Sequence, residues 1–152
     1  MTIDAELSPA GKAALAETEL RYRTIAGAVK HREPANRRAS VSLYGWIIRN
    51  VDREGQLAGG WAPLAPSTVK RKAKAGKEKM MVMTGRLRNS FRSFYDNDVA
   101  GAGSDVPYSE FHEKGGTHLP RRILLPPREE ALDIGIKVYE HYIARAVEGA
   151  SP

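Results

Sequence analysis

Two histidines and two glutamates within residues 110–118 of this 152-residue chain are the side chains best suited to chemistry. Imidazole nitrogens and carboxylate oxygens are common zinc ligands and common acid–base groups. Their spacing fits no established zinc motif, and two glycines interrupt the segment. We therefore expect a structural or interface role and no metal ion, with a hydrolase using His112 or His118 as an alternative. The four residues are Glu110, His112, Glu113 and His118.

Other arrangements typical of enzymes are missing from the sequence. Ser67, Ser90 and Ser104 lack the G-x-S-x-G turn that exposes a serine nucleophile. The pair Gly76-Lys77 is followed by glutamate, where a phosphate-binding loop needs serine or threonine. We expect neither a catalytic residue nor a cofactor.

Basic residues are concentrated in blocks, and the formal charge of the chain is +6. Such blocks favour a binding surface for phosphates or for an acidic protein, although a solvated helix face is the plainer interpretation. No aromatic residue interrupts the block from 70 to 79, which argues against stacking on single-stranded bases. The candidate electrostatic surface comprises Lys70, Arg71, Lys72, Lys74, Lys77, Lys79, Arg86, Arg88 and Arg92.

The first third of the chain has the apolar spacing of two helices. Ser8 suits an N-cap and Pro9 a first helical position, and apolar residues recur at helical spacing from Ala13 to Lys30. We expect Pro34 to break or kink this helix. A second helix should run from about Ala35 to Glu54, with a glycine after it as a stop residue.

The middle of the chain predicts short elements separated by glycine and proline. Alternating residues after Ser90 indicate a strand, and small residues after the Asp-Asn-Asp turn indicate its antiparallel return. The expected elements are a helix Thr68–Ala75 capped by Ser67, an apolar run 80–83, a helical turn Gly85–Ser90, strands 91–96 and 99–103, a helix Pro107–Lys114, and a strand Ile123–Leu125.

A last helix is expected from Arg128 to Val147, and it carries two apolar stripes. One stripe contains Val138 and Tyr142, and the other contains Ile136 and Ile143. A helix that is apolar on two sides in so small a domain suggests that one side packs on its own core and the other on a neighbouring subunit.

Three aromatic side chains could either fill the core or anchor a partner. We favour the core for Trp61, Tyr108 and Phe111, while we expect the surrounding segments and the last helix to carry subunit contacts. The candidate contact residues are Trp61, Leu64, Tyr108, Phe111, His112, Tyr139, Tyr142 and Ile143.

These elements predict an α+β fold, with a small antiparallel sheet flanked by N-terminal helices and a long C-terminal helix. Residues 1–11 are expected to form a flexible leader, 12–148 a single domain and 149–152 a tail. The chain has no cysteine, no apolar signal-peptide region and no run of membrane-spanning length. We expect a protein made in the cytoplasm that does not contact a membrane.

Four short motifs occur in a fixed order along the chain: GWAPL at 60–64, MTGRL at 83–87, VPYS at 106–109 and PRR at 120–122. This order resembles the phage virion morphogenesis, or tail completion, family of Mu-like phages and prophages. The resemblance covers about residues 39–127. The chain departs from the family pattern in the turn before the tryptophan and in single residues beside the tyrosine and the histidine.

The resemblance implies a structural protein without enzymatic activity, located in the neck of the virion between head and tail. Copies would form a ring around the DNA channel, about six in number, with about twelve as the less expected count. Its partners would be other neck, portal-adaptor or tail proteins, and the basic blocks would allow non-specific contact with phage DNA. The alternative from the composition is a small basic DNA-binding protein.

Overall fold

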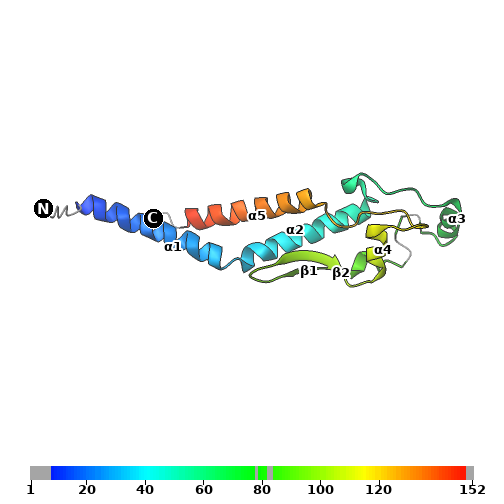
Figure 1. The fold of residues 1–152 in the computed structure, drawn as a ribbon, viewed down its shortest axis with the longest axis horizontal. Coiled ribbons are helices and arrows are strands. Elements are labelled where there is room, and N and C mark those ends of the chain that lie inside the picture. Colours follow the sequence, from blue (N-terminus) through cyan, green and yellow to red (C-terminus); the bar gives the residue numbers. More distant parts are fainter. Residues whose placement is uncertain (1–7, 78, 82–83, 150–152) are drawn as a thin grey trace.

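The computed structural model describes residues 8–77, 79–81 and 84–149, and within them it forms an elongated, mainly helical molecule (Figure 1). The α+β prediction is confirmed: a two-stranded antiparallel sheet accompanies N-terminal helices and a long C-terminal helix. Most of the predicted leader and tail, and part of the apolar run 80–83, lie outside the described residues. The elements are α1 (Pro9–Lys30), α2 (Glu33–Asp52), α3 (Pro66–Lys74), α4 (Tyr108–Lys114), α5 (Arg128–Glu148), β1 (Phe91–Tyr95), β2 (Ala100–Ser104) and the 3-10 turns Gln56–Ala58 and Arg88–Ser90.

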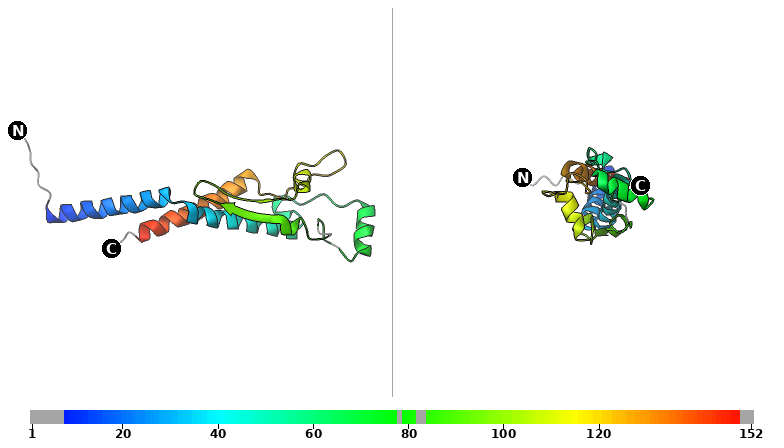
Figure 2. Two further views of the ribbon diagram at one scale, coloured as in Figure 1. Left: turned by 90° about the horizontal axis from the view of Figure 1, so that it is seen from below. Right: turned by 90° about the vertical axis from the view of Figure 1, so that its right-hand side faces the viewer.

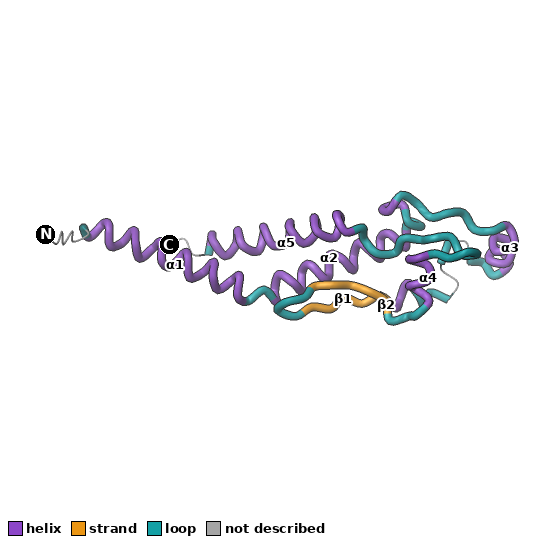
Figure 3. Tube along the Cα trace, in the orientation of Figure 1, coloured by secondary structure: helices purple, strands orange, loops and turns teal. Residues whose placement is uncertain are grey.

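The helices α1, α2 and α5 run roughly along the long axis, and α3 lies across the far end (Figures 1 and 2). Helix α5 packs against both α1 and α2. Most of the connecting loops gather at the α3 end, beyond the β-hairpin (Figure 3). No helix within the described ranges combines the length and the apolar character that crossing a bilayer requires.

The start of α1 follows the predicted cap. The Ser8 hydroxyl accepts a hydrogen bond from the Gly11 N–H at 3.1 Å, and Pro9 occupies the first turn. Residues 9–11, which the predicted leader included, belong to this helix, in keeping with the start predicted at Ser8 and Pro9. The break predicted at Pro34 lies instead at His31 and Arg32, because proline is harmless in the first turn of a helix.

The hairpin turn fastens the junction between α1 and α2. The side-chain oxygen of Asn97 accepts from the Arg32 N–H at 2.8 Å, and its amide donates to the Lys30 carbonyl at 3.1 Å. The Arg32 guanidinium also forms an ion pair with Asp98 at 2.7 Å. One turn between two strands thus satisfies backbone groups that both helix ends leave unpaired.

The β-hairpin lies against α2 and pairs Phe91 with Ser104 and Tyr95 with Ala100. The returning strand begins one residue later than predicted, at Ala100. The exposed Phe94 ring lies over Gly101, and it would have to turn aside for a larger residue there, because a Cβ atom would lie 2.4 Å from it.

The core lies where α2, the loop after it, the hairpin and the segment before α5 meet. Two donors converge on one backbone carbonyl in this region: the Asn50 amide and the Trp61 indole N–H each donate to the Ile123 carbonyl at 2.9 Å. The fully packed cluster consists of Trp46, Ile47, Val51, Trp61, Leu87, Phe91 and Leu124.

The strand predicted at Ile123–Leu125 was wrong, because no strand within the described residues pairs with this segment. Side chains supply its hydrogen bonds instead: besides the two donors on Ile123, the Glu113 carboxylate accepts from the Leu124 N–H at 2.6 Å and the Leu125 N–H at 3.2 Å. The segment is extended, and side chains of helix α2, the Trp61 loop and helix α4 hold it in place through hydrogen bonds.

Helix α3 begins at Pro66, earlier than predicted, and Ser67 is not its cap. Ala65 occupies the N-cap position without a side-chain hydrogen bond, so the start depends on the proline, whose backbone angle suits the first helical position.

Two glycines in the loop after α2 allow a test of the Trp61 packing. Gly55 and Gly59 both have a left-handed backbone, with φ of 83° and 91°. A Cβ atom at Gly55 would lie 2.1 Å from the Trp61 ring, whereas none of the described atoms lies within 4 Å of one at Gly59. We expect Gly59→Ala to lower the free energy of unfolding by about 1 kcal/mol and Gly55→Ala by roughly 1–3 kcal/mol more.

Urea denaturation followed by tryptophan fluorescence measures both variants. Equal losses for the two substitutions would mean that Trp61 does not pack on the Gly55 backbone.

Candidate assembly surfaces

The three predicted core aromatics have different environments. Trp61 is buried in the core, which confirms that interpretation and leaves its side chain unavailable to a partner. For Tyr108 and Phe111 the core interpretation was wrong, because 37% and 64% of their surfaces are exposed on α4. Helix α4 is short and is held to the core through Glu113, so its other side faces outward.

The predicted contact residues of α5 are half-buried within the chain. The Tyr139 hydroxyl donates to the Asn36 side chain at 2.5 Å, and the Tyr142 hydroxyl donates to the His31 carbonyl at 2.8 Å. These bonds, with half-buried Ile143, hold α5 against the α1–α2 junction. That a neighbouring subunit also contacts these residues stays a prediction.

The outward line of α5 contains two large apolar side chains that the contact prediction did not include. Leu132 and Ile136 are 54% and 56% exposed and stand one helical turn apart. The sequence already showed the α5 stripe that contains Ile136. The contact prediction chose residues from the C-terminal half of the helix, whereas the most exposed apolar side chains lie in its N-terminal half.

Two members of the predicted electrostatic surface do not belong to it. Lys72 belongs to α3, but its side chain is buried on the inner side of that helix, and it has an interaction partner. Arg88 binds Asp52 through two parallel hydrogen bonds of 2.7 and 2.9 Å. Arg88 follows a turn that carries its side chain back onto α2, so its charge is largely matched within the chain.

Most of the remaining basic residues form an exposed group, which we call the basic tip, at the α3 end of the molecule (Figure 1). Helix α3 contains no acidic residue, and these exposed cations have no ion pair within the described part of the chain. The basic tip comprises Lys70, Arg71, Lys74, Lys77, Lys79 and Arg86; Arg92, also exposed, lies on the hairpin and bonds to backbone carbonyls at 2.6 and 2.8 Å.

The four candidate metal or acid–base residues have separate roles. Glu110 forms an ion pair with Lys114, and Glu113 holds the backbone before α5. His118 is exposed in the following loop, and only His112 is partly buried. Among the residues that the structure describes, no group of three such side chains is placed to hold a metal ion.

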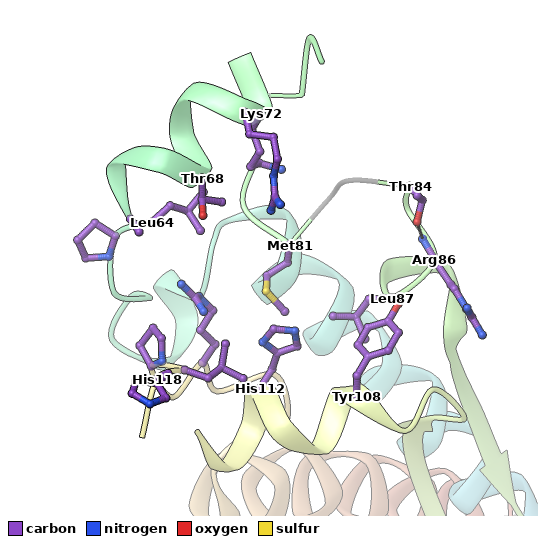
Figure 4. A pocket seen from close by; sticks show the side chains of 16 residues that line it. Leu64, Thr68, Lys72, Met81, Thr84, Arg86, Leu87, Tyr108, His112 and His118 are labelled. Carbon is purple, nitrogen blue, oxygen red and sulfur yellow. Dashed lines mark hydrogen bonds between the residues drawn. The ribbon is translucent and has the colours of Figure 1, made fainter. Parts of the chain in front are cut away.

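His112 faces a pocket of about 640 Å³ between α3, α4 and the loops at residues 84–87 and 118–122. Figure 4 shows Lys72 reaching in from α3 and His112 from α4, with Met81 between them. The Tyr108 ring meets the His112 ring edge-on at 6.2 Å between centroids. Predicted contact residue Leu64 also lines the pocket.

The pocket is electropositive. Burial, together with the nearby Arg122 charge, lowers the pKa of His112, so its neutral form is favoured at neutral pH. The Nδ1 atom of His112 is buried without a hydrogen-bond partner. Arg122 was missed as a site residue, because nothing in the PRR motif distinguishes a buried arginine from its exposed neighbour Arg121.

The sequence matches the phage virion morphogenesis family over residues 22–144. The chain belongs to this family. No curated protein and no solved structure matches the chain. The matched span begins within α1 and ends within α5, so it includes the hairpin, the pocket and the basic tip.

Membership of the phage virion morphogenesis family indicates a structural role in assembling the phage particle. In the described residues the histidines and carboxylates form ion pairs, hold backbone or stand apart, and they do not converge as an acid–base pair.

The Asp52–Arg88 pair gives a test by pH. The hydrogen bond from Arg88 lowers the pKa of Asp52, so the pair adds stability above the ordinary carboxyl pKa of 3.8 and loses it as pH falls through the lowered value. Both side chains are 37% exposed, so solvent screens the pair. We expect Asp52→Asn to cost about 0.5–1 kcal/mol at neutral pH and almost nothing at about pH 2.

Urea unfolding at both pH values measures this difference, with Asp133→Asn, which breaks a more exposed ion pair with Lys137, as the control. A loss that is equally large at both pH values would show that Asp52 acts by packing and not by charge.

Proposed function

We propose that the protein is a subunit of a ring at the head–tail connection of a phage particle, with six copies around the DNA channel as the expected number. The family supports a role in the virion. Exposed apolar surface on two long helices supports self-association, and the basic tip supports proximity to DNA or to acidic neighbours.

The observation that carries the proposal is the apolar surface of α1 and α5. Helix α1 has 22 residues and buries none of them fully. Most helices gain their stability from packing an apolar face, so a long helix without a buried face points to a partner. The exposed apolar residues are Leu15, Leu20, Tyr22 and Val29 on α1 and Leu132 and Ile136 on α5.

A ring follows from these surfaces if they meet between copies. Two different faces that meet head-to-tail generate a closed ring when the rotation between copies closes. The outward line of α5 and the exposed side of α1 are different faces of the same helix pair, so they can supply the two halves of such a contact.

The ring predicts a specific loss. Leu132→Glu with Ile136→Glu places two charges in the contact, and desolvating them opposes association. We expect native mass spectrometry and negative-stain images to show rings for the wild type and monomers for the variant. Val69→Glu, an equally exposed change on α3, should leave the ring intact.

Circular dichroism must show the same helical content for all three proteins. Rings of unchanged mass in the double variant would contradict the proposed contact, and a wild-type chain that never enters particles would contradict the function.

The basic tip supports a second candidate, a DNA-binding protein. Its cations are exposed and have no ion pair in the described residues. If duplex DNA binds there, replacing four cations by glutamine should weaken binding, and each lost phosphate contact should reduce the slope of log K against log salt by about 0.9. The residues to replace are Lys70, Arg71, Lys74 and Lys77.

The control replaces four exposed cations of α1 and should leave the slope unchanged. Tight, steeply salt-dependent binding by a monomer that forms no ring would favour the DNA-binding function over the structural one. The control residues are Lys12, Arg21, Arg23 and Lys30.

A further inference from the structure

Arg122 is a buried cation without a matching charge. Only 4% of its surface is exposed, and it takes part in no ion pair within the described residues. Its Nη2 atom donates to the Ala62 carbonyl at 3.5 Å, a long contact, and its Nε atom is buried without a partner. The guanidinium therefore keeps most of its five donors unused.

This arrangement is unfavourable in the isolated subunit. Burial lowers the pKa of Arg122, but an arginine guanidinium keeps its proton in proteins, so the positive charge remains. Removing a charge from water costs free energy that only an opposite charge or well-formed hydrogen bonds recover. The described residues supply neither in full, so the Arg122 guanidinium can still accept an anionic group.

The pocket that contains Arg122 shows what that group would be. Among the described residues, its lining includes the cations Arg71 and Arg86 and no acidic residue. Beside the unpartnered Nδ1 of His112, the walls include apolar side chains of Leu64 and Leu119. A ligand that suits these walls has an anionic head and an apolar stem.

A phosphate on duplex DNA does not fit this description. Its oxygens lie on a broad, uniformly charged backbone, and such a backbone cannot reach a guanidinium that is almost fully covered. A glutamate side chain carries its carboxylate on a narrow aliphatic stem and can bind a guanidinium through two parallel hydrogen bonds.

We propose that this pocket receives a glutamate side chain, flanked by apolar residues, from a neighbouring protein subunit of the phage particle. The carboxylate binds Arg122, and the apolar neighbours lie against Leu64 and Leu119. The identity of the partner, a subunit of the phage particle, rests on the assembly role proposed above. The preference of the pocket for a glutamate side chain depends only on the residues of this chain.

Nuclear magnetic resonance of the four histidines tests the pocket directly. The probe is the peptide acetyl-Leu-Glu-Leu-amide, added up to about 10 mM, a range that detects binding weaker than 1 mM. We expect a saturable shift of the His112 signal and a rise of its pKa, because a carboxylate offsets the nearby Arg122 charge. The matched peptide with glutamine in place of glutamate should have no effect.

Arg122→Met should abolish the peptide effect, and its thermal midpoint should equal or exceed that of the wild type, because methionine removes an unmatched buried charge. Arg121→Met, at the exposed neighbouring position, should respond to the peptide like the wild type. A lower midpoint for Arg122→Met would show that the charge already has a structural partner and would overturn the proposal.

Three further results would overturn the proposal: an unmoved His112 signal, an equal response to the glutamine peptide, or the same shift produced by a DNA duplex. None of these results bears on the proposed ring, because ring formation is tested separately with the Leu132 and Ile136 substitutions. Conversely, a wild-type protein that is monomeric but binds the glutamate peptide would support the pocket proposal and contradict the ring proposal.

Discussion

The packing of this protein depends on one backbone carbonyl, that of Ile123. It accepts hydrogen bonds from the Asn50 amide and the Trp61 indole, and it lies beside the buried Leu124. Through it the end of α2, the loop after α2 and the segment before α5 become one unit. A buried carbonyl has two lone pairs, and satisfying both makes the arrangement specific. The position of α4 follows from the same segment, because Glu113 holds the two N–H groups after Ile123.

The other end of the molecule is organised by polar contacts and not by a core. Asn97 joins the ends of α1 and α2, and Tyr142 adds a bond from α5 to the same junction. No residue of α1 or α5 is fully buried. The molecule therefore has a packed half around Ile123 and a half of paired helices, and the pocket proposed to receive a glutamate belongs to the first.

Periodicity was enough to predict the helices, the hairpin and α4, because those elements obtain their hydrogen bonds locally or from a neighbour in sequence. It failed at Ile123–Leu125, where side chains distant in sequence take the place of a strand. It failed again for the charged residues. A run of lysines and arginines gives no sign that Lys72 faces inward, that Arg88 meets Asp52, or that Arg122 is covered. Those outcomes depend on which loop folds over which side chain.

The exposed helix α1 has a consequence for the timing of assembly. A segment with so little buried surface opens locally at small free-energy cost, so we expect α1 to fray more readily than the core in a free subunit. A neighbour that packs against it must offset the entropy of ordering α1, which lowers the affinity between copies. Rings would then form only above a threshold subunit concentration, and a part of the particle that gathers copies would lower that threshold.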